Sequence, residues 1–188
     1  MKNLFLIIGA PGSGKTTDAQ IIAKEDNKIA HFSTGELLRA EVASGSNLGL
    51  KIETIINAGE IVPVKIALDA IIKAIHSSTC NTILIDGYPR SDEQMRGLDD
   101  VLNDEKDIVL KSVIEVKVSE QTAMDRVLGR NRGADDNIEV FKNRMNVYTE
   151  PLQGIQDFYN SKNLLHKISG EKDIKTVVQE MTTFINSI

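Results

Sequence analysis

The chain of 188 residues lacks the sequence features of secreted proteins, of membrane-spanning proteins and of small domains that are stabilised by zinc. Its one cysteine, Cys80, excludes an internal disulfide and a zinc site built from several cysteines. No apolar run approaches the roughly 20 residues that span a bilayer. The apolar stretch at residues 4–8 is too short for a signal peptide. We therefore expect a cytoplasmic protein that has no membrane segment.

Basic residues are also few. The 22 Lys and Arg residues are outnumbered by 27 Asp and Glu residues, which gives a net charge of −5, and the charges are scattered along the chain. Nucleic acids and anionic membranes attract proteins with a concentrated positive field, so neither is expected as a partner. The overall charge does not exclude a local cationic cleft. The length is sufficient to bury a core as one domain with insertions, and a monomer is the default expectation.

Short apolar runs alternate with longer amphipathic stretches along the chain. Four of the runs have the length of a strand: residues 4–8, 82–85, 112–118 and 164–168. Apolar strands without polar alternation, separated by helices, are typical of a parallel sheet that is covered on both faces. The pattern predicts an α/β fold.

The segments between these runs have helical spacing. We expect no further strand between residue 25 and residue 81, where a small helical insert is predicted. Its first helix should begin at residues 33–36, which have the S-x-x-E spacing of a capping box. Residues 138–155 predict one long helix with a bend at Pro151 and Gly154. Further helices are expected at residues 15–24, 48–58, 64–75 and 173–185.

A glycine-rich motif follows the first predicted strand. Residues 9–16, G-A-P-G-S-G-K-T, match G-x-x-x-x-G-K-[ST] in full and precede a predicted helix. The glycines let backbone N–H groups surround phosphate oxygens at the helix N-terminus. Lys15 can bridge the terminal phosphates, and the Thr16 hydroxyl can reach Mg²⁺. A tight turn alone has no use for Lys-Thr at this offset, so the motif predicts a nucleoside triphosphate site.

Arginines are prominent beyond this loop. Arg90 ends the turn that follows the strand at residues 82–85, and Asp86 opens the same turn, where it can hold a Mg²⁺-bound water. Four more arginines follow later in the chain: Arg126, Arg130, Arg132 and Arg144. Any one of them could be a solvated surface residue. Together with the phosphate loop they favour transfer of a phosphoryl group between two phosphates, because planar, permanently charged donors stabilise the charge that develops.

Several motifs in the same order resemble the adenylate kinase family of nucleoside monophosphate kinases over nearly the whole chain. They are residues 9–16, S-T-G-E-L-L-R at 33–39, D-G-Y-P-R at 86–90 with Gln94, the Arg126 and Arg130 pair, Asp135-Asp136, Arg144 and Gly170. The resemblance implies reversible phosphoryl transfer from MgATP to AMP, which gives two ADP and maintains the balance of adenine nucleotides. It implies Mg²⁺ as the cofactor.

The resemblance also implies a domain organisation. The fold would be a P-loop NTPase-type parallel sheet flanked by helices, with a core of residues 1–32, 63–129 and 137–188. A helical monophosphate-binding insert would cover about 33–62 and a very short lid about 130–136. Many bacterial members carry a long lid here, sometimes with a zinc-binding cysteine cluster, whereas this chain matches the short form and no zinc is expected.

Residue roles follow from the same resemblance. The implied ATP-binding residues are Gly12, Ser13, Gly14, Lys15, Thr16, Thr17, Arg126, Arg130 and Lys172. The implied AMP-binding residues are Thr34, Gly35, Arg39, Glu60, Ile61, Val62, Gly87, Tyr88, Pro89, Arg90, Gln94, Arg132 and Arg144. The implied catalytic residues are Lys15, Arg90, Arg126, Arg130, Arg132 and Arg144, and Mg²⁺ would be held near Thr16 and Asp86.

Two alternatives to this activity stay open. A UMP/CMP kinase usually has Ala in place of Thr34 and Asn near the place of Gln94, so these two residues indicate adenine selection; the other interpretation of Gln94 is an exposed helix residue. An ATP-dependent switch module would bind the triphosphate without a second substrate. No histidine or cysteine constellation suggests a nucleophile or base, and His31, His76 and His166 are interpreted as structural or surface residues.

Overall fold

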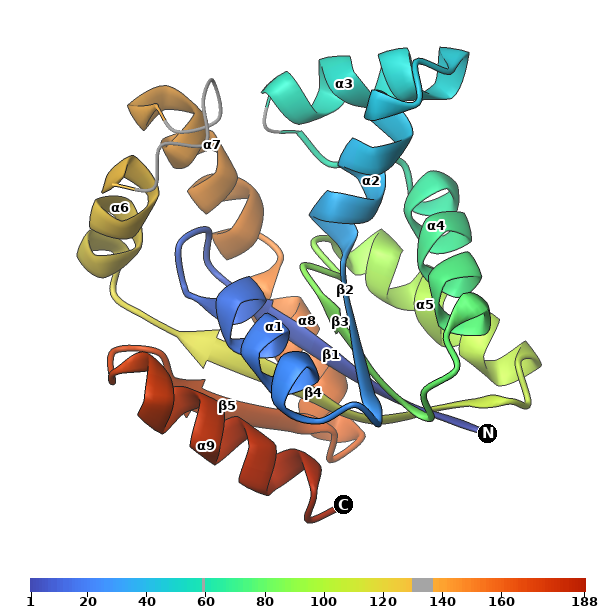
Figure 1. Cartoon of the computed structure of the whole chain (residues 1–188). Coiled ribbons are helices and arrows are strands. Elements are labelled where there is room, and N and C mark those ends of the chain that lie inside the picture. Colours follow the sequence, from blue (N-terminus) through green and yellow to red (C-terminus); the bar gives the residue numbers. More distant parts are fainter. Residues whose placement is uncertain (59, 130–136) are drawn as a thin grey trace.

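A computed structural model describes residues 1–58, 60–129 and 137–188 of the chain. Its strands form one parallel five-stranded sheet in the order β2-β3-β1-β4-β5 (Figure 1). The strands are β1 (Lys2–Gly9), β2 (Ile29–Ser33), β3 (Thr82–Asp86), β4 (Ile108–Lys117) and β5 (Leu165–Ser169). The α/β class is confirmed, and four strands coincide with the apolar runs.

The second strand corrects the expectation that no strand lies between residues 25 and 81. β2 pairs with β3 alone, at the edge of the sheet. Its sequence, I-A-H-F-S, buries only its first and last residues fully. An edge strand needs no continuous apolar run, and so the pattern used to find the central strands misses it.

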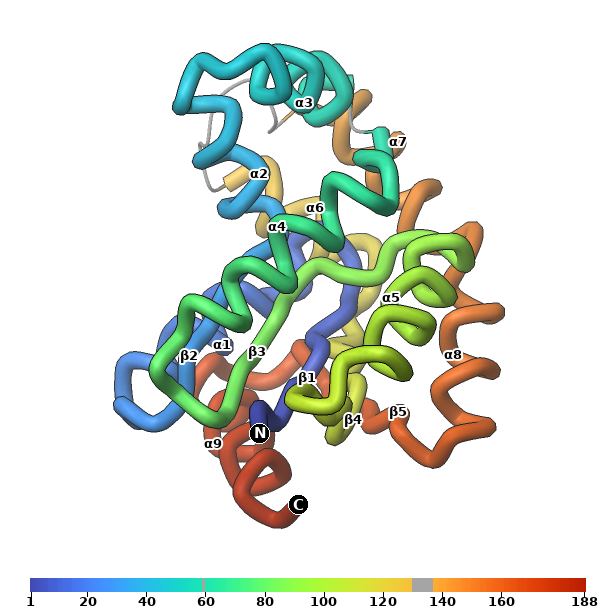
Figure 2. The backbone as a smooth tube through the Cα atoms, turned by 90° about the vertical axis from the view of Figure 1, so that its right-hand side faces the viewer, coloured from blue at the N-terminus to red at the C-terminus, as the bar shows by residue number. Residues whose placement is uncertain are grey.

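Helices cover both faces of the sheet (Figures 1 and 2). One face carries α1 (Lys15–Glu25) and α9 (Ile174–Ile185), and the other carries α4 (Val64–Ser77), α5 (Asp92–Asp104) and α8 (Leu152–Ser161). Successive side chains of β1 alternate between these layers. Leu4, Leu6 and Ile8 pack on the side of α4, α5 and α8, and Phe5 and Ile7 pack towards α1 and α9.

Two helical pairs stand beyond the carboxyl ends of the strands (Figure 1). They are α2 (Thr34–Ala43) with α3 (Asn47–Ala58), and α6 (Glu120–Gly129) with α7 (Ile138–Thr149). The first pair has a small core around Leu38 and Ile52, and the second buries Phe141 and Met145 against Ala10 of the loop after β1. Among the described helices, none is long and apolar enough to cross a membrane.

Two details of the helix predictions are corrected. α2 begins where the capping-box motif predicts, but the Ser33 side chain makes no cap hydrogen bond and donates to Asp86 instead. The helix expected over 138–155 is two helices, α7 and α8, separated at Glu150 and Pro151. Proline has no N–H to donate to the carbonyl four residues earlier, so the helical hydrogen bonds are interrupted at Pro151 and the helix ends rather than bends.

Candidate active site

The loop between β1 and α1 has the backbone shape that the glycine motif predicts. Gly12 has φ +84°, a left-handed conformation that side chains rarely adopt. A Cβ at this position would lie 2.3 Å from the carbonyl oxygen of Ala123 in α6. The Ser13 N–H donates to the carbonyl of Ala10 at 3.0 Å and closes the turn. The loop therefore packs tightly against α6, and its glycines are required.

Lys15 and Thr16 open α1 directly after this loop. The Lys15 ammonium donates to the carbonyl of Ala10 at 3.3 Å, so its side chain folds back over the loop. The Thr16 hydroxyl donates to Oδ1 of Asp86 at 3.0 Å. β1 and β3 are neighbouring parallel strands, with Ile7 opposite Asp86, so their carboxyl ends bring the loop and this acid together. Thr16 and Asp86, the two residues that the sequence analysis expects beside Mg²⁺, are thus in direct contact.

Asp86 is buried and has two further partners, His31 and Ser33 of β2. Nε2 of His31 lies 2.6 Å from Oδ2, and the Ser33 hydroxyl lies 3.4 Å from Oδ1. Burial alone would raise the pKa of Asp86, but the His31 hydrogen bond and the charge of Lys15 outweigh it and lower the pKa. Asp86 is therefore ionised at neutral pH. The sequence analysis interprets His31 only as a structural or surface residue. Had β2 been predicted, the alternation of side chains along a strand would have put His31 on the same face as Ser33, next to Asp86.

The turn after β3 positions Arg90 through Gln94. The Arg90 N–H donates to Oε1 of Gln94 at 2.8 Å, and the Arg90 Nε donates to the carbonyl of Gly87 at 2.9 Å. Gln94 is only 3% exposed, and its Nε2 donates to the carbonyl of Val62 at 3.1 Å. The interpretation of Gln94 as an exposed helix residue is therefore wrong. Its side chain joins the Arg90 turn to the segment that precedes α4.

The start of α2 contributes Thr34, Gly35 and Arg39. Thr34 is 4% exposed, and within the described part of the chain its hydroxyl has no hydrogen-bond partner. An unpaired buried hydroxyl is unfavourable and indicates a position where a ligand supplies the partner. A Cβ on Gly35 would lie 3.2 Å from the Arg39 guanidinium, so the glycine leaves room for that group.

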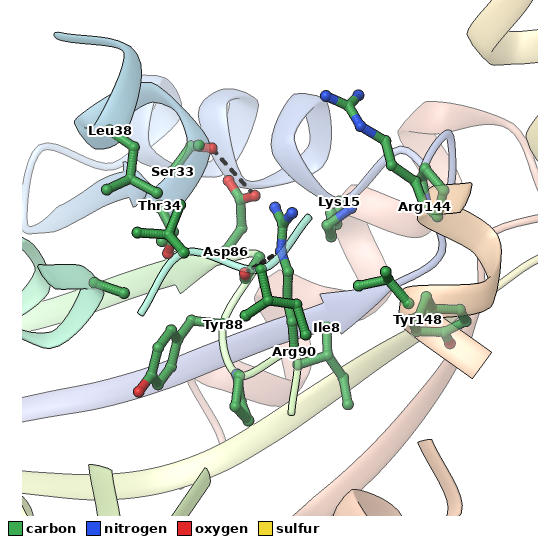
Figure 3. Close-up of a pocket in the computed structure, with 18 of the residues that line it drawn as sticks. Ile8, Lys15, Ser33, Thr34, Leu38, Asp86, Tyr88, Arg90, Arg144 and Tyr148 are labelled. Carbon is green, nitrogen blue, oxygen red and sulfur yellow. Dashed lines mark hydrogen bonds between the residues drawn. The ribbon is translucent and has the colours of Figure 1, made fainter. Parts of the chain in front are cut away.

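The guanidinium groups of Arg39, Arg90 and Arg144 lie close enough together to influence one another. Burial lowers the pKa of Arg90 first, the positive charges of Arg144 and Arg39 lower it further, and Asp86 opposes them. With a usual pKa above 12, Arg90 stays charged. Figure 3 shows Arg90 rising beside Asp86, with Lys15 and Arg144 on its other side. Like charges repel, so this cluster is relieved when an anion occupies it.

One cavity of about 590 Å³ joins these groups, a volume typical of small-ligand sites. It brings together most of the residues that the sequence predicted: Gly12, Lys15, Thr16, Thr34, Gly35, Arg39, Glu60, Ile61, Val62, Asp86, Gly87, Tyr88, Pro89, Arg90, Gln94 and Arg144. It is also lined by Tyr148 of α7, which the sequence analysis did not identify. The helical spacing of Tyr148 from Arg144 is the signal that could have identified it.

Other predicted residues lie outside this lining. Arg126 donates from Nη1 to the Ser13 carbonyl at 3.3 Å and from Nη2 to the Gly170 carbonyl at 3.0 Å, so it lies on the far side of the phosphate loop. Lys172 pairs with Glu180 of α9. Ser13, Gly14 and Thr17 belong to the loop and the first turn of α1. Arg130, Arg132 and the predicted lid at 130–136 lie outside the described residues.

Asp18, one turn into α1, is a further acid that the sequence analysis missed. It is buried, and a Cβ on Gly14 would lie 3.3 Å from its Oδ2. Burial raises the pKa of Asp18 to about 6, although the nearby charge of Arg126 lowers it in part. Its position under the phosphate loop gives the donor side of the site a pH-sensitive group.

Comparison with known proteins agrees with this geometry. The family model for adenylate kinase matches residues 7–164. The chain is 61% identical to the adenylate kinase of Wolinella succinogenes over 188 residues, which cover 100% of this chain and 99% of that protein. It is 60% identical to the adenylate kinases of Campylobacter fetus subsp. fetus and of Helicobacter pylori strain G27, each over 100% of this chain and 98% of the relative. The matches extend over the phosphate loop, the arginine cluster and the helices around the cavity, and the chain belongs to the adenylate kinase family.

Proposed function

We propose that the chain transfers the terminal phosphoryl group of MgATP to AMP, reversibly, and so forms two ADP. The observation that carries the proposal is the single cavity in which the phosphate loop faces Thr34, Arg39, Arg90 and Gln94. A switch that binds only a triphosphate has no use for this second set of residues. Membership of the adenylate kinase family favours neither this switch nor a pyrimidine kinase.

On the donor side, the loop amides and Lys15 hold the ATP phosphates. Arg126 lies between Ser13 and Gly170, and so can contact the ATP phosphates and base once the triphosphate displaces part of its backbone bonding. The backbone at Gly170 and Lys172 faces the ATP adenine in this proposal. The proposed role of Arg130, beside Arg126, rests on the family resemblance alone.

On the acceptor side, Arg39 and Arg90 hold the AMP phosphate. The AMP base lies against Thr34, whose buried hydroxyl then gains a partner. Gln94 already donates to Val62 and accepts from Arg90, and its amide retains a second N–H for the base. A site whose buried polar groups need the correct base rejects other bases strongly.

The residues around Asp86 fit Mg²⁺. An ionised carboxylate and the Thr16 hydroxyl, 3.0 Å apart, are oxygen donors of the kind that this ion prefers. Among the described residues, no group of three acidic, histidine or cysteine side chains could hold a metal alone. This suits an ion held largely by substrate phosphates and water. When bound, the ion neutralises phosphate charge.

The reaction needs no protein base. At neutral pH an ionised oxygen of the AMP phosphate attacks the terminal phosphorus of ATP, and the bond from that phosphorus to the bridging oxygen breaks. Lys15, Arg90 and Arg144 stabilise the negative charge on the transferring group, and Arg132 joins them in the resemblance. Because all of these groups are permanently charged donors, positioning and electrostatics carry the catalysis.

The domain organisation remains part of the proposal. The insert at about 33–62 carries the acceptor site in this proposal, and the short lid expected at about 130–136 lies outside the described residues. Some exclusion of water is required, because open access would favour ATP hydrolysis. A monomeric state and a cytoplasmic location stay predictions.

The test is a coupled assay with MgATP and each of AMP, CMP, UMP and GMP. We expect kcat/KM for AMP to exceed the others by orders of magnitude. Equal turnover of a pyrimidine nucleotide would contradict the base assignment. ATP binding without turnover of any monophosphate would contradict the kinase assignment itself.

A further inference from the structure

A fully buried carboxylate near the cavity has no part in the steps above. Glu115 lies towards the carboxyl end of β4, is 0% exposed, and pairs in register with Ile8 of β1, the residue before the phosphate loop. Val113, two residues earlier on the same face, belongs to the apolar core. Burying a carboxylate where an apolar side chain fits costs free energy unless polar partners compensate.

The partners of Glu115 come mainly from the helices that flank Pro151. Gln156 of α8 donates from Nε2 to both carboxylate oxygens, at 3.0 and 2.9 Å. Tyr148 of α7 is the second partner: burial, and after it the charge and hydrogen bond of Glu115, raise the pKa of Tyr148. Lys167 of β5 lies 3.8 Å from Oε2. The carboxylate therefore holds the corner between α7 and α8 to the sheet.

The same corner determines where Arg144 lies. Arg144 and Tyr148 are four residues apart on α7, so they share one face, and both line the cavity. In Figure 3, the Tyr148 hydroxyl is turned away from Lys15 and Arg90, and the Arg144 guanidinium extends over the cavity.

α7 has other contacts along its length. Asn143 donates from Nδ2 to the carbonyl of Ala58 in α3 at 2.7 Å, nearer the start of α7 than Tyr148. Phe141 and Met145 pack on α6 and the loop after β1 through apolar contacts. Apolar contacts are non-directional, whereas a hydrogen bond to a fixed carboxylate has a preferred geometry. The contact between Tyr148 and Glu115 is thus a directional restraint that fixes the carboxyl end of α7 to the sheet.

We infer that Glu115 is a positioning residue for phosphoryl transfer, which acts through Tyr148 to hold Arg144 at the transferring group. The inference rests on the proposed function, in which Arg144 contacts that group. A small displacement of a charged donor lowers the rate of the chemical step strongly. Arg39 and the loop amides lie on elements other than α7, so we expect kcat to be affected more than KM.

The experiment measures single-turnover phosphoryl transfer by rapid quench, together with steady-state KM values and Tm, so that product release cannot hide the chemistry. The proteins are wild type, E115Q, Y148F, R144A and the double variants E115Q/R144A and Y148F/R144A. We expect E115Q and Y148F each to lower the transfer rate about tenfold or more, with both KM values changed less than about threefold. In the R144A background, each should change the rate less than about twofold.

Y159F is the matched control, because Tyr159 is also buried but does not line the cavity. Its transfer rate should stay within about twofold of wild type. If E115Q or Y148F keeps the wild-type rate, or lowers it by the same factor with and without Arg144, the inference is wrong. Should E115Q unfold, Y148F decides, since it leaves Glu115 bonded to Gln156. If wild type itself transfers no phosphoryl group to AMP, the proposed function fails instead.

Discussion

Nε2 of His31 lies 2.6 Å from Oδ2 of Asp86, and this contact joins the edge strand β2 to the acid beside the phosphate loop. An ionised carboxylate can only accept hydrogen bonds, so Nε2 carries the proton. The remaining oxygen of Asp86 accepts from Thr16 and Ser33. The orientation of Asp86 is therefore determined by three side chains from two elements outside its own strand.

Replacing His31 by alanine should lower the stability of the fold near neutral pH, and less in acid. The pKa of Asp86 is lowered in the folded chain, so its stabilisation is present above about pH 4 and is lost as the pH falls further. Without the His31 hydrogen bond the pKa of Asp86 is lowered less, so the variant should lose about 1–3 kcal/mol near neutral pH, and this deficit should shrink as the pH falls below about 4. Thermal unfolding between pH 3 and 7 measures both effects. H76A, at an exposed histidine 3.6 Å from Glu105, should follow the wild-type curve.

Arg90→Ala should lower kcat far more than it lowers stability. Its guanidinium lies among Arg39, Arg144 and Asp86 in the cavity, and in the proposed mechanism it contacts charge that develops during transfer. Loss of such a contact costs about 3–4 kcal/mol in the transition state, which is a decrease of about 10²–10³-fold in kcat. R96A is the control, because Arg96 is exposed and pairs only with Asp92 one turn earlier. Normal kcat in R90A would remove Arg90 from the mechanism.

Thr34→Ala should weaken the use of AMP without lowering the stability of the fold. Removing a buried hydroxyl that has no partner should leave the free energy of unfolding unchanged or raise it by about 1 kcal/mol. Loss of the base contact should lower kcat/KM for AMP about tenfold or more and narrow the preference over CMP. The control is T54A in α3, where the exposed hydroxyl donates to the carbonyl of Leu50. A large loss of stability with unchanged AMP kinetics would assign Thr34 a purely structural role.

Asp18→Asn should stabilise the protein at neutral pH. The pKa of Asp18 is raised from 3.8 to about 6, so the folded chain binds a proton more tightly than the unfolded chain. Its protonated form is favoured in the fold below pH 4, and the ionised form costs up to about 3 kcal/mol above pH 6. Denaturant unfolding at pH 5 and pH 8 should show a gain for D18N that grows with pH. D69N, at an exposed acid of α4, should show no such trend; the same trend there would contradict the assignment.

The parts of the fold that have strong local patterns were predictable. The phosphate loop, the four apolar strands and the helix at the C-terminus follow from residue types and spacing that need little tertiary information. β2 was missed because an edge strand has one neighbour and a mixed sequence, and His31 was missed with it.

The contacts of the site depended on tertiary structure. Gln94 could be identified as a site residue from its spacing of four residues from Arg90 in the sequence. Its hydrogen bond to the Val62 carbonyl could not be predicted, because it joins segments 32 residues apart. The burial of Asp18 and Glu115 could not be predicted from their residue type, because acidic residues are usually exposed. Pro151 predicted an irregularity, but the sequence pattern did not distinguish a bent helix from the two separate helices α7 and α8.

The strand order has a consequence for how the two halves of the site hold together over time. The donor loop leaves β1, which is paired on both sides, while the acceptor helices leave β2, which is paired on one. Local opening is easiest where fewest backbone bonds must break, so α2 and α3 should exchange their amide protons much faster than β1. In the proposed function, the acceptor nucleotide can then leave by local unfolding of α2 and α3 while the phosphate loop, which binds the triphosphate, stays folded.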